Sequence, residues 1–307
     1  MAEAVREQKP SPFTKIVNFY DKHHQPLMIA SLVLLFFFLG VMGFHKMTTG
    51  EFLSKDITLS GGLLITINTD QTLDTQSLAT QIETKLGVSA DVKALGSLSG
   101  GSVGYAIELE KSTNSTSALE AIRQITGLEL APGSYTIEDQ SAGFGNSFWQ
   151  SAVQAIILAF VFMSIVVFLY FRVPIPSAAI ILCGFADTVG TMAIMNLIGM
   201  KLSTGGVAAL LMIIGYSVDT DILLSSRLLK HHEGSLDQRI HSSIKTGLTM
   251  QFTAIAALTA LWILTPATLL KQIAEILIIG LILDIFYTWF QNVGILRWYI
   301  TRKGEHG

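Results

Sequence analysis

Four aspartates lie inside apolar segments of this 307-residue chain, where leucine or valine would cost less free energy. They are Asp187, Asp219, Asp221 and Asp284, and Arg227 follows the third at the polar end of its segment. An aspartate at the centre of a membrane span costs about 2.5–3.5 kcal/mol on insertion scales, so such acids face a bundle interior or a wet cavity. Four of them in one small bundle favour a path for protons or ions, and structural hydrogen bonding is the alternative for each one.

Helical spacing predicts which way the two neighbouring acids face. Ser217 and Asp221 lie four residues apart and therefore on one face of a helix. Asp219 lies about 200° around the helix from Asp221, so the two acids cannot share one small pocket. Because Gly215 stands one turn before Asp219 and permits close helix approach, we expect Asp219 to face inward, toward Asp187. Asp221 is then expected to face the sixth span or another protein.

The elements that must position these acids are membrane-spanning helices. Half of the residues are hydrophobic and only 14% are charged, whereas a soluble domain has about a quarter charged. A span needs about 20 mostly apolar residues. The sequence predicts six spans: Pro26–Phe44, Trp149–Phe171, Ile175–Ile198, Ser203–Ser226, Gly247–Thr265 and Ile273–Gly294. We therefore expect a multi-pass protein of the cell membrane, in contact with lipid.

Lysine and arginine predict the orientation and the domain division. With both termini in the cytoplasm, the inner segments hold most basic residues outside the long polar insertion, and the two short outer loops hold only Lys201 and Lys271. Arg227 then lies at the inner edge, where snorkelling is the simpler interpretation and a place in an ion relay the alternative. The expected divisions are an inner segment (1–25), a first helix (26–44), an outer domain (45–148), a five-helix bundle (149–294) and an inner tail (295–307).

The polar insertion has the pattern of a small α+β domain. Strands are expected in 56–68, 88–96, 102–110 and 134–139, and helices in 74–87 and 115–127, with a turn at 97–101. Asp74 and Gly87 are helix-cap residues, and Ser117 and Glu120 have capping-box spacing. The order β-α-β-β-α-β is that of the ferredoxin-like fold, whose sheet leaves one face free for docking.

Composition also excludes several kinds of function. A net charge of −3 argues against nucleic acid or another polyanion as a partner. The single cysteine, Cys183, excludes an internal disulfide. We find no cluster with the spacing of a metal site and no set of catalytic residues in the insertion. The chain is therefore not expected to be an enzyme, and we expect neither metal nor cofactor.

Three motifs resemble one family of membrane proteins. "GYSVDTDILLSSR" (215–227) resembles the fourth-helix motif of the SecF half of the SecDF protein-export complex, in an archaeal variant. "DITLSGGLLITI" (56–67) resembles the first strand of the outer domain in that family, and "FADTVGT" (185–191) resembles its third-helix motif. The spacing from Asp56 to Gly61 is longer than in bacterial members, and Ala186 stands where these often carry histidine. The layout of one helix, an insertion and five helices matches along the whole chain.

This resemblance implies a fold and a role. The fold is half of a transporter of the resistance-nodulation-division type, completed by SecD into a pseudo-symmetric twelve-helix assembly. It implies assistance to the Sec translocation channel, outer domains that engage the translocating polypeptide, and ion flow through membrane carboxylates. Asp187 matches the third-helix acid of the family. The fourth-helix acid is shifted by one position, so that either Asp219 or Asp221 replaces it.

Two other functions fit parts of the pattern. A proton-driven exporter of small molecules would also need six helices and intramembrane acids, although no large porter domain is present. An intramembrane aspartyl protease would need two facing aspartates, for which Asp187 and Asp219 are the available pair. The sequence before Asp219 is Gly-Tyr-Ser-Val rather than Gly-x-Gly, and "TPAT" (265–268) differs from the Pro-Ala-Leu of such enzymes.

Overall fold

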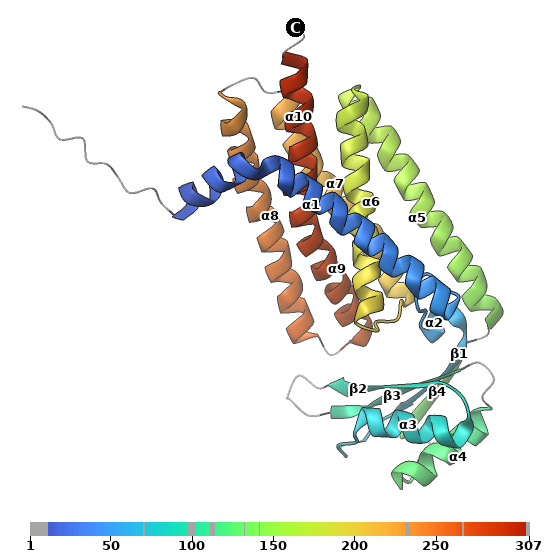
Figure 1. Cartoon of the computed structure of the whole chain (residues 1–307). Helices are drawn as coiled ribbons and strands as arrows, with labels where there is room; N and C mark the ends of the chain where they lie inside the picture. The colour runs from blue at the N-terminus through green and yellow to red at the C-terminus, as the bar shows by residue number, and fades with distance from the viewer. Residues whose placement is uncertain are drawn as a thin grey trace, which may run out of the picture.

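A computed structural model describes residues 12–69, 71–96, 102–110, 114–131, 133–140, 142–230, 234–265 and 267–304. Long helices form a bundle, and a small α/β domain lies at one end of it (Figure 1). The C-terminal helix ends on the opposite side of the bundle from this domain. The bundle elements are α1 (Pro12–Thr49), α5 (Ala142–Phe171), α6 (Pro174–Leu197), α7 (Thr204–Leu229), α8 (Leu236–Leu264), α9 (Thr268–Phe286), the π-helix η1 (Tyr287–Asn292) and α10 (Val293–Gly304).

Five segments in the described helices are long and apolar enough to cross a membrane, and five of the six predicted spans lie on them. They are His23–Thr49, Ser147–Phe171, Pro174–Leu197, Thr204–Leu229 and Leu236–Leu264. The sixth predicted span is helical too, but it is not among the five. Its helix α9 carries three charged residues and continues into η1 and α10 as one long helical segment.

Two helices begin earlier than the sequence predicted. α8 begins at Leu236 rather than Gly247, because Ser235 and the Gln238 side chain form a capping box at its start. α1 extends back to Pro12 and bends at His23, whose φ of −115° and ψ of 20° are not helical. The bend precedes Pro26, which lacks an N–H and crowds the preceding turn.

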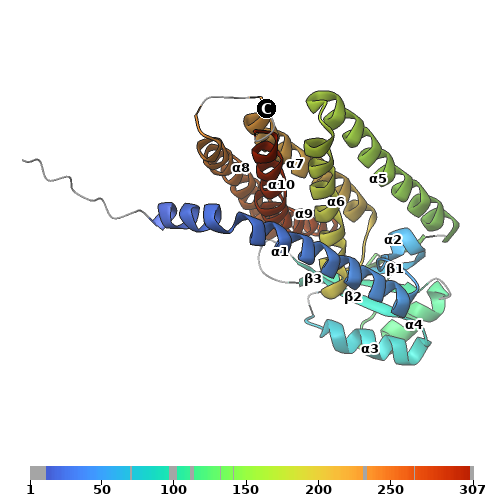
Figure 2. The same cartoon turned by 45° about the horizontal axis from the view of Figure 1, so that its top comes forward.

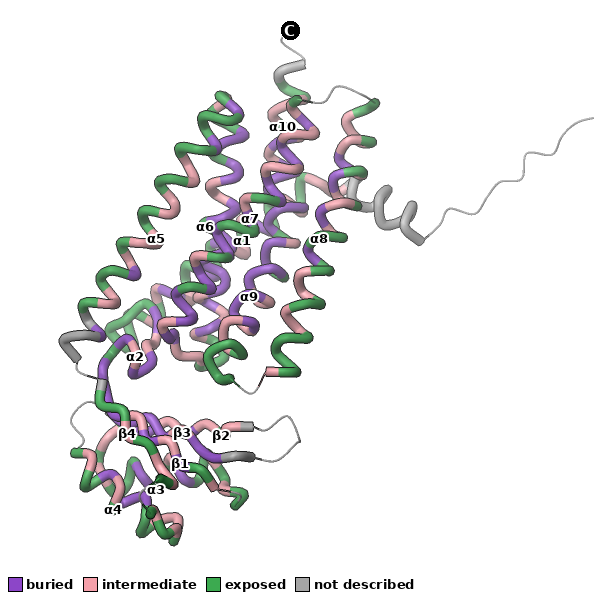
Figure 3. Tube along the Cα trace, turned by 180° about the vertical axis from the view of Figure 1, so that it is seen from behind, coloured by how far each residue is buried: buried purple, intermediate pink, exposed green. Residues whose placement is uncertain are grey.

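Three helices, α6, α7 and α9, form the centre of the bundle, and α1, α5 and α8 lie around them. More than half of the residues in the apolar stretches of α6 and α7 are buried, and fewer than a quarter of those in α1, α5 and α8 (Figure 3). α1 crosses the bundle obliquely against α6, η1 and α10 (Figure 2). α7 and α9 approach closely at Gly280, where an added Cβ would lie 2.5 Å from Ile213 Cδ1. The inward sides of α6, α7 and α9 therefore meet at the middle of the bundle.

The α/β domain follows α1. Its elements are α2 (Ile57–Ser60), β1 (Gly62–Ile67), α3 (Thr75–Leu86), β2 (Ala90–Gly96), β3 (Ser102–Glu110), α4 (Ser115–Thr126) and β4 (Tyr135–Gln140). The strands lie in the order β2-β3-β1-β4, and every neighbouring pair is antiparallel. α3 and α4 cover the sheet face that points away from the bundle (Figure 1). The other face points toward the bundle.

The predicted order β-α-β-β-α-β is confirmed, with two local corrections. Residues 57–60, predicted as strand, form the short helix α2, because the Asp56 side chain accepts a hydrogen bond from the Thr58 N–H and Gly61 (φ 80°) ends the turn. α4 is capped by Asn114 rather than by a Ser117–Glu120 box. The predicted turn at 97–101 lies outside the described residues.

Candidate functional site

Three of the four intramembrane aspartates are buried together in the bundle. Asp187 on α6 and Asp221 on α7 are 0% exposed, and Asp284 on α9 is 1% exposed. The three carboxyl groups interact electrostatically with one another, and the side chains of Asp187 and Asp284 are in direct contact. Three helices thus bring acids that are far apart in the sequence to one place.

Asp187 is joined to α7 through a hydroxyl group. The Ser217 Oγ donates to Asp187 Oδ2 at 2.5 Å. Ser217 lies one turn before Asp221 and both are buried, because this stripe of α7 faces α6 and α9. The other oxygen of Asp187, Oδ1, has no donor among the described residues. It can therefore share a proton with a neighbouring carboxyl group.

Asp221 and Asp284 are joined by one threonine. The Thr288 Oγ1 lies 3.0 Å from Asp221 Oδ1 and 2.8 Å from Asp284 Oδ1. A hydroxyl group carries a single proton and can donate to only one of the two. Both contacts are hydrogen bonds at the same time only when the other carboxyl group is protonated and donates to Thr288. The arrangement therefore fits one proton held between two acids.

The π-helix η1 positions the groups beneath Asp221. Thr288 and Asn292 lie four residues apart in η1 and point to the same side of it. Both side chains reach Asp221, and the Asn292 Nδ2 donates to Asp221 Oδ1 at 2.7 Å.

A glutamine on α8 completes the site. The Gln251 Nε2 donates to Asp284 Oδ2 at 2.6 Å, and the Trp289 Nε1 donates to Gln251 Oε1 at 2.9 Å. Gly247 makes room for this tryptophan, because an added Cβ would collide with the Trp289 ring. Gln251 and Asn292 were not among the site residues expected from the sequence. Their signal was available, since amides inside apolar segments need partners just as acids do.

Asp219 does not join the other acids, so the predicted facing of α7 is wrong. Asp219 is exposed on the outside of the bundle, and Ser217 takes the place expected for it beside Asp187. A Cβ added at Gly215 would meet nothing on a neighbouring helix within 4 Å, so this glycine does not mediate close packing. Asp221 faces α9 and η1, which was one of its two expected directions. The pair of Asp187 and Asp219 that a protease would need is not formed.

Arg227 lies apart from the acids' hydrogen-bond network. Its Nη1 donates to the backbone oxygen and Oγ of Ser242 and to the Thr246 Oγ1, at 2.8, 3.0 and 3.1 Å. All three acceptors belong to the first half of α8. Arg227 therefore ties the end of α7 to α8, and none of these three contacts joins it to an aspartate.

Comparison with known proteins identifies the family. Residues 129–302, more than half of the chain, match the family model described as protein export membrane protein SecD/SecF, C-terminal. The protein-export membrane protein SecF of Pyrococcus furiosus is 37% identical over 83% of this chain and 84% of its own length. That of Methanocaldococcus jannaschii is 38% identical over 89% of this chain and 93% of its own length.

The fold of a solved structure agrees with this match. The crystal structure of SecDF from Thermus thermophilus, described as a translocon-associated membrane protein, covers 96% of this chain with a TM-score of 0.71 at 18% identity. This chain spans only 39% of that longer protein. Taken with the sequence matches, the chain belongs to the SecF family of protein-export membrane proteins.

Proposed function

We propose that this chain works with SecD to assist the passage of polypeptides through the Sec channel, and that protons or other ions crossing the bundle drive it. The observation that carries the coupling is the chain of buried groups from Asp187 through Asp284 and Thr288 to Asp221. Family membership supports the export role. Burying three carboxyl groups together is costly unless they are hydrogen-bonded and share protons, which is what this chain of groups allows.

Proton exchange at this site would change how the helices hold together. With Thr288 donating to one acid and accepting from the other, α7 and α9 are joined on both sides of the hydroxyl. Loss of the shared proton leaves two carboxylates competing for one donor, and their repulsion favours separation of α7 from α9. A change of protonation thereby becomes a change of helix packing.

SecD is proposed to cover the outside of α7. An exposed stripe on this helix, between α5 and α8, contains Met212, Gly215, Tyr216 and Asp219. Met212 and Tyr216 are 43% and 41% exposed. A carboxylate facing lipid would cost about 2.5–3.5 kcal/mol near the middle of a span, so Asp219 favours a protein partner with a polar group at this stripe.

The topology proposed for this role has six spans, the sixth formed by α9, η1 and the start of α10. Both termini lie in the cytoplasm, and the α/β domain lies outside, with the exposed apolar sides of α1, α5 and α8 facing lipid. The strand order β2-β3-β1-β4 and the two helices on one face support assigning the α/β domain to the ferredoxin-like fold. Its outer position would let it contact the translocating polypeptide.

The two aspartates of α7 provide the test, because Asp221 lies on the buried side of the helix and Asp219 on its exposed side. Asp221→Asn removes a proton-binding group of the buried site, while Asp219→Asn changes the exposed stripe. We expect Asp221→Asn to co-purify with SecD and to lose stimulation of export in cells depleted of the wild-type chain. Asp219→Asn is expected to lower co-purification with SecD. Wild-type export with Asp221→Asn would refute the coupling role.

A further inference from the structure

The loop that joins the two acid-bearing helices is fastened to the α/β domain. This loop, residues 198–203, runs from α6 to α7 on the side of the bundle facing the sheet. It pairs with residues 53–56, here called the strap, which lead from α1 into α2. The Leu202 N–H donates to the Ser54 O, and the Asp56 N–H donates to the Leu202 O, both at 2.8 Å. Leu202 and Leu53 are buried in one core, so this joint is firm.

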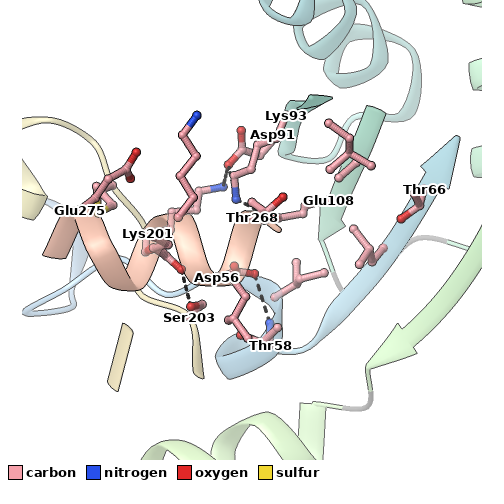
Figure 4. A pocket seen from close by; sticks show the side chains of 18 of the residues that line it. Asp56, Thr58, Thr66, Asp91, Lys93, Glu108, Lys201, Ser203, Thr268 and Glu275 are labelled. Carbon is pink, nitrogen blue, oxygen red and sulfur yellow. Dashed lines mark hydrogen bonds and ion pairs between the residues drawn. The ribbon is translucent and has the colours of Figure 1, made fainter. Parts of the chain in front are cut away.

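A chain of alternating charges forms a second connection. Lys93 on β2 lies 2.7 Å from Glu108 Oε1 on β3 and 3.7 Å from Asp91 Oδ2 on β2. Lys201 of the loop lies 3.3 Å from the same Asp91 Oδ2. Figure 4 shows Lys93 and Lys201 on either side of Asp91. This ion pair therefore connects the edge strand of the sheet directly to the loop between α6 and α7.

The two connections differ in strength. The side chains of Lys201 and Asp91 are 35% and 32% exposed, and an ion pair of that exposure contributes little and can open and re-form. A cleft of about 590 Å³ separates the sheet from the outer ends of α7 and α9, with Thr66 on the sheet side and Thr268 on the bundle side (Figure 4). The sheet is thus not packed tightly on the bundle around the ion pair.

We propose that the loop and the strap transmit helix movement to the α/β domain, and that the Lys201–Asp91 pair is a latch that holds the domain over the cleft. This inference rests on the proposed function, in which protonation changes the packing of α7. α6 carries Asp187 and α7 carries Asp221, so a shift of α7 relative to α6 must move the loop between them. Because the loop is bonded to the strap, the strap and α2 move together with the loop. The latch opens when the edge of the sheet that carries Asp91 does not follow this movement.

A pair of labels across the cleft measures the latch without any export assay. Thr268 at the start of α9 lines the cleft, and Ser89 before β2 lines a neighbouring hollow that shares Lys201 and Glu108 with it. Both residues are exposed, so spin labels on introduced cysteines report the sheet-to-bundle distance in the full chain in proteoliposomes. The native Cys183 is buried. The wild type is expected to show one main distance, with a minor longer one.

Charge reversal provides the test of the latch. Lys201→Asp and Asp91→Lys should each raise the population of the longer distance, by about 1.5- to 5-fold for a pair of this exposure. The double exchange Asp91→Lys/Lys201→Asp should move the distribution back toward that of the wild type, although not the whole way, because the new lysine at position 91 lies beside Lys93. Lys271→Asp, which alters a lysine of the same cleft bound over the Trp262 ring, is the matched control and should change nothing. An unchanged distribution in both single variants would overturn the latch and leave the export role untouched.

A second comparison tests transmission. Asp187 is buried inside the bundle, and its side chain is bonded to Ser217 rather than to Lys201 or Asp91. The variant Asp187→Asn therefore leaves the latch residues themselves unchanged. It should shift the balance between the two distances if the loop transmits helix packing. A distribution identical to that of the wild type would overturn the transmission, whether or not the same variant loses export.

Discussion

The hydroxyl group of Thr288 is the part of the buried site whose loss is easiest to interpret. Thr288→Val keeps the shape of a fully buried side chain and removes only the group that lies between Asp221 and Asp284. We expect this variant to loosen the packing of η1 against its neighbours. We also expect it to lose export stimulation, because the two acids can no longer share a proton through the hydroxyl.

The expected size of the effect follows from the contacts that remain. A hydrogen bond to a charged group contributes about 1.5–3 kcal/mol, and an unsatisfied buried acceptor costs about 1–3 kcal/mol. Asp221 keeps Asn292 as a donor, and Asp284 keeps Gln251. Each acid therefore keeps one hydrogen-bond donor, and the free energy that holds η1 against its neighbours should fall by about 1–3 kcal/mol in Thr288→Val.

The single cysteine provides the assay. Cys183 is buried on α6, and its Sγ lies 3.5 Å from the Tyr287 O and 3.6 Å from the Gln291 Nε2, both in η1. Cys183 also packs in one cluster with side chains of α1, so a thiol reagent reaches it when the helices around it, η1 among them, open. When reclosing is fast, the labelling rate follows the opening equilibrium, so a loss of 1–3 kcal/mol corresponds to roughly 5- to 150-fold faster labelling.

Two variants control for other effects of the substitution. Thr288→Ser keeps the hydroxyl and should label more slowly than Thr288→Val. Thr188→Val makes the same change at a buried threonine of α6 whose hydroxyl donates to the Gly184 O of its own helix, and it should label nearly as slowly as the wild type. The reasoning is refuted if Thr288→Val labels at the wild-type rate, or if both valine variants accelerate equally.

Three further results are expected. Gly247→Ala should destabilise the bundle by about 1–3 kcal/mol in thermal unfolding, because its Cβ would displace the Trp289 ring. Burial, and after it the neighbouring Asp56 carboxylate, raises the pKa of the Glu108 carboxyl group above its ordinary value of 4.5. The folded domain therefore binds a proton at Glu108 more tightly than the unfolded chain does. β3 should then gain stability as the pH falls toward 4.5 and lose it as the pH rises through the raised pKa, measured by hydrogen exchange corrected for intrinsic rates. A cysteine introduced at Ser235 should escape labelling by an impermeant reagent added from outside, as the basic residues predict.

Each of these results has a control. Gly40→Ala adds the same methyl group where nothing lies within 4 Å, and equal destabilisation would argue against the collision with the ring. Glu108→Gln should flatten the pH dependence of β3, and a slope that survives this change would assign it to another group. Labelling of Ser235→Cys from outside, with Ser89→Cys protected, would reverse the proposed orientation.

Local pattern in the sequence determined the elements of this protein. Apolar runs of span length predicted five helices that the structure contains, and alternating strands with turn residues predicted the order β-α-β-β-α-β. The sequence also predicted helix ends that depend on one capping side chain or one glycine, as at Asp74 and Gly87 of α3. α2 escaped prediction because its single turn depends on the cap at Asp56 within a run of strand-forming residues.

Tertiary structure decided which face of each membrane helix looks inward. In a soluble protein the apolar stripe marks the buried face, but here both lipid and bundle interior are apolar, so periodicity does not distinguish them. Spacing alone placed Asp219 and Asp221 on opposite sides of α7, and only the packing of α7 against α6 and α9 showed that Asp221 is the buried one. The sharing of Thr288 between two acids likewise depends on the packing of α7 against α9 and η1, which no local pattern in the sequence announced.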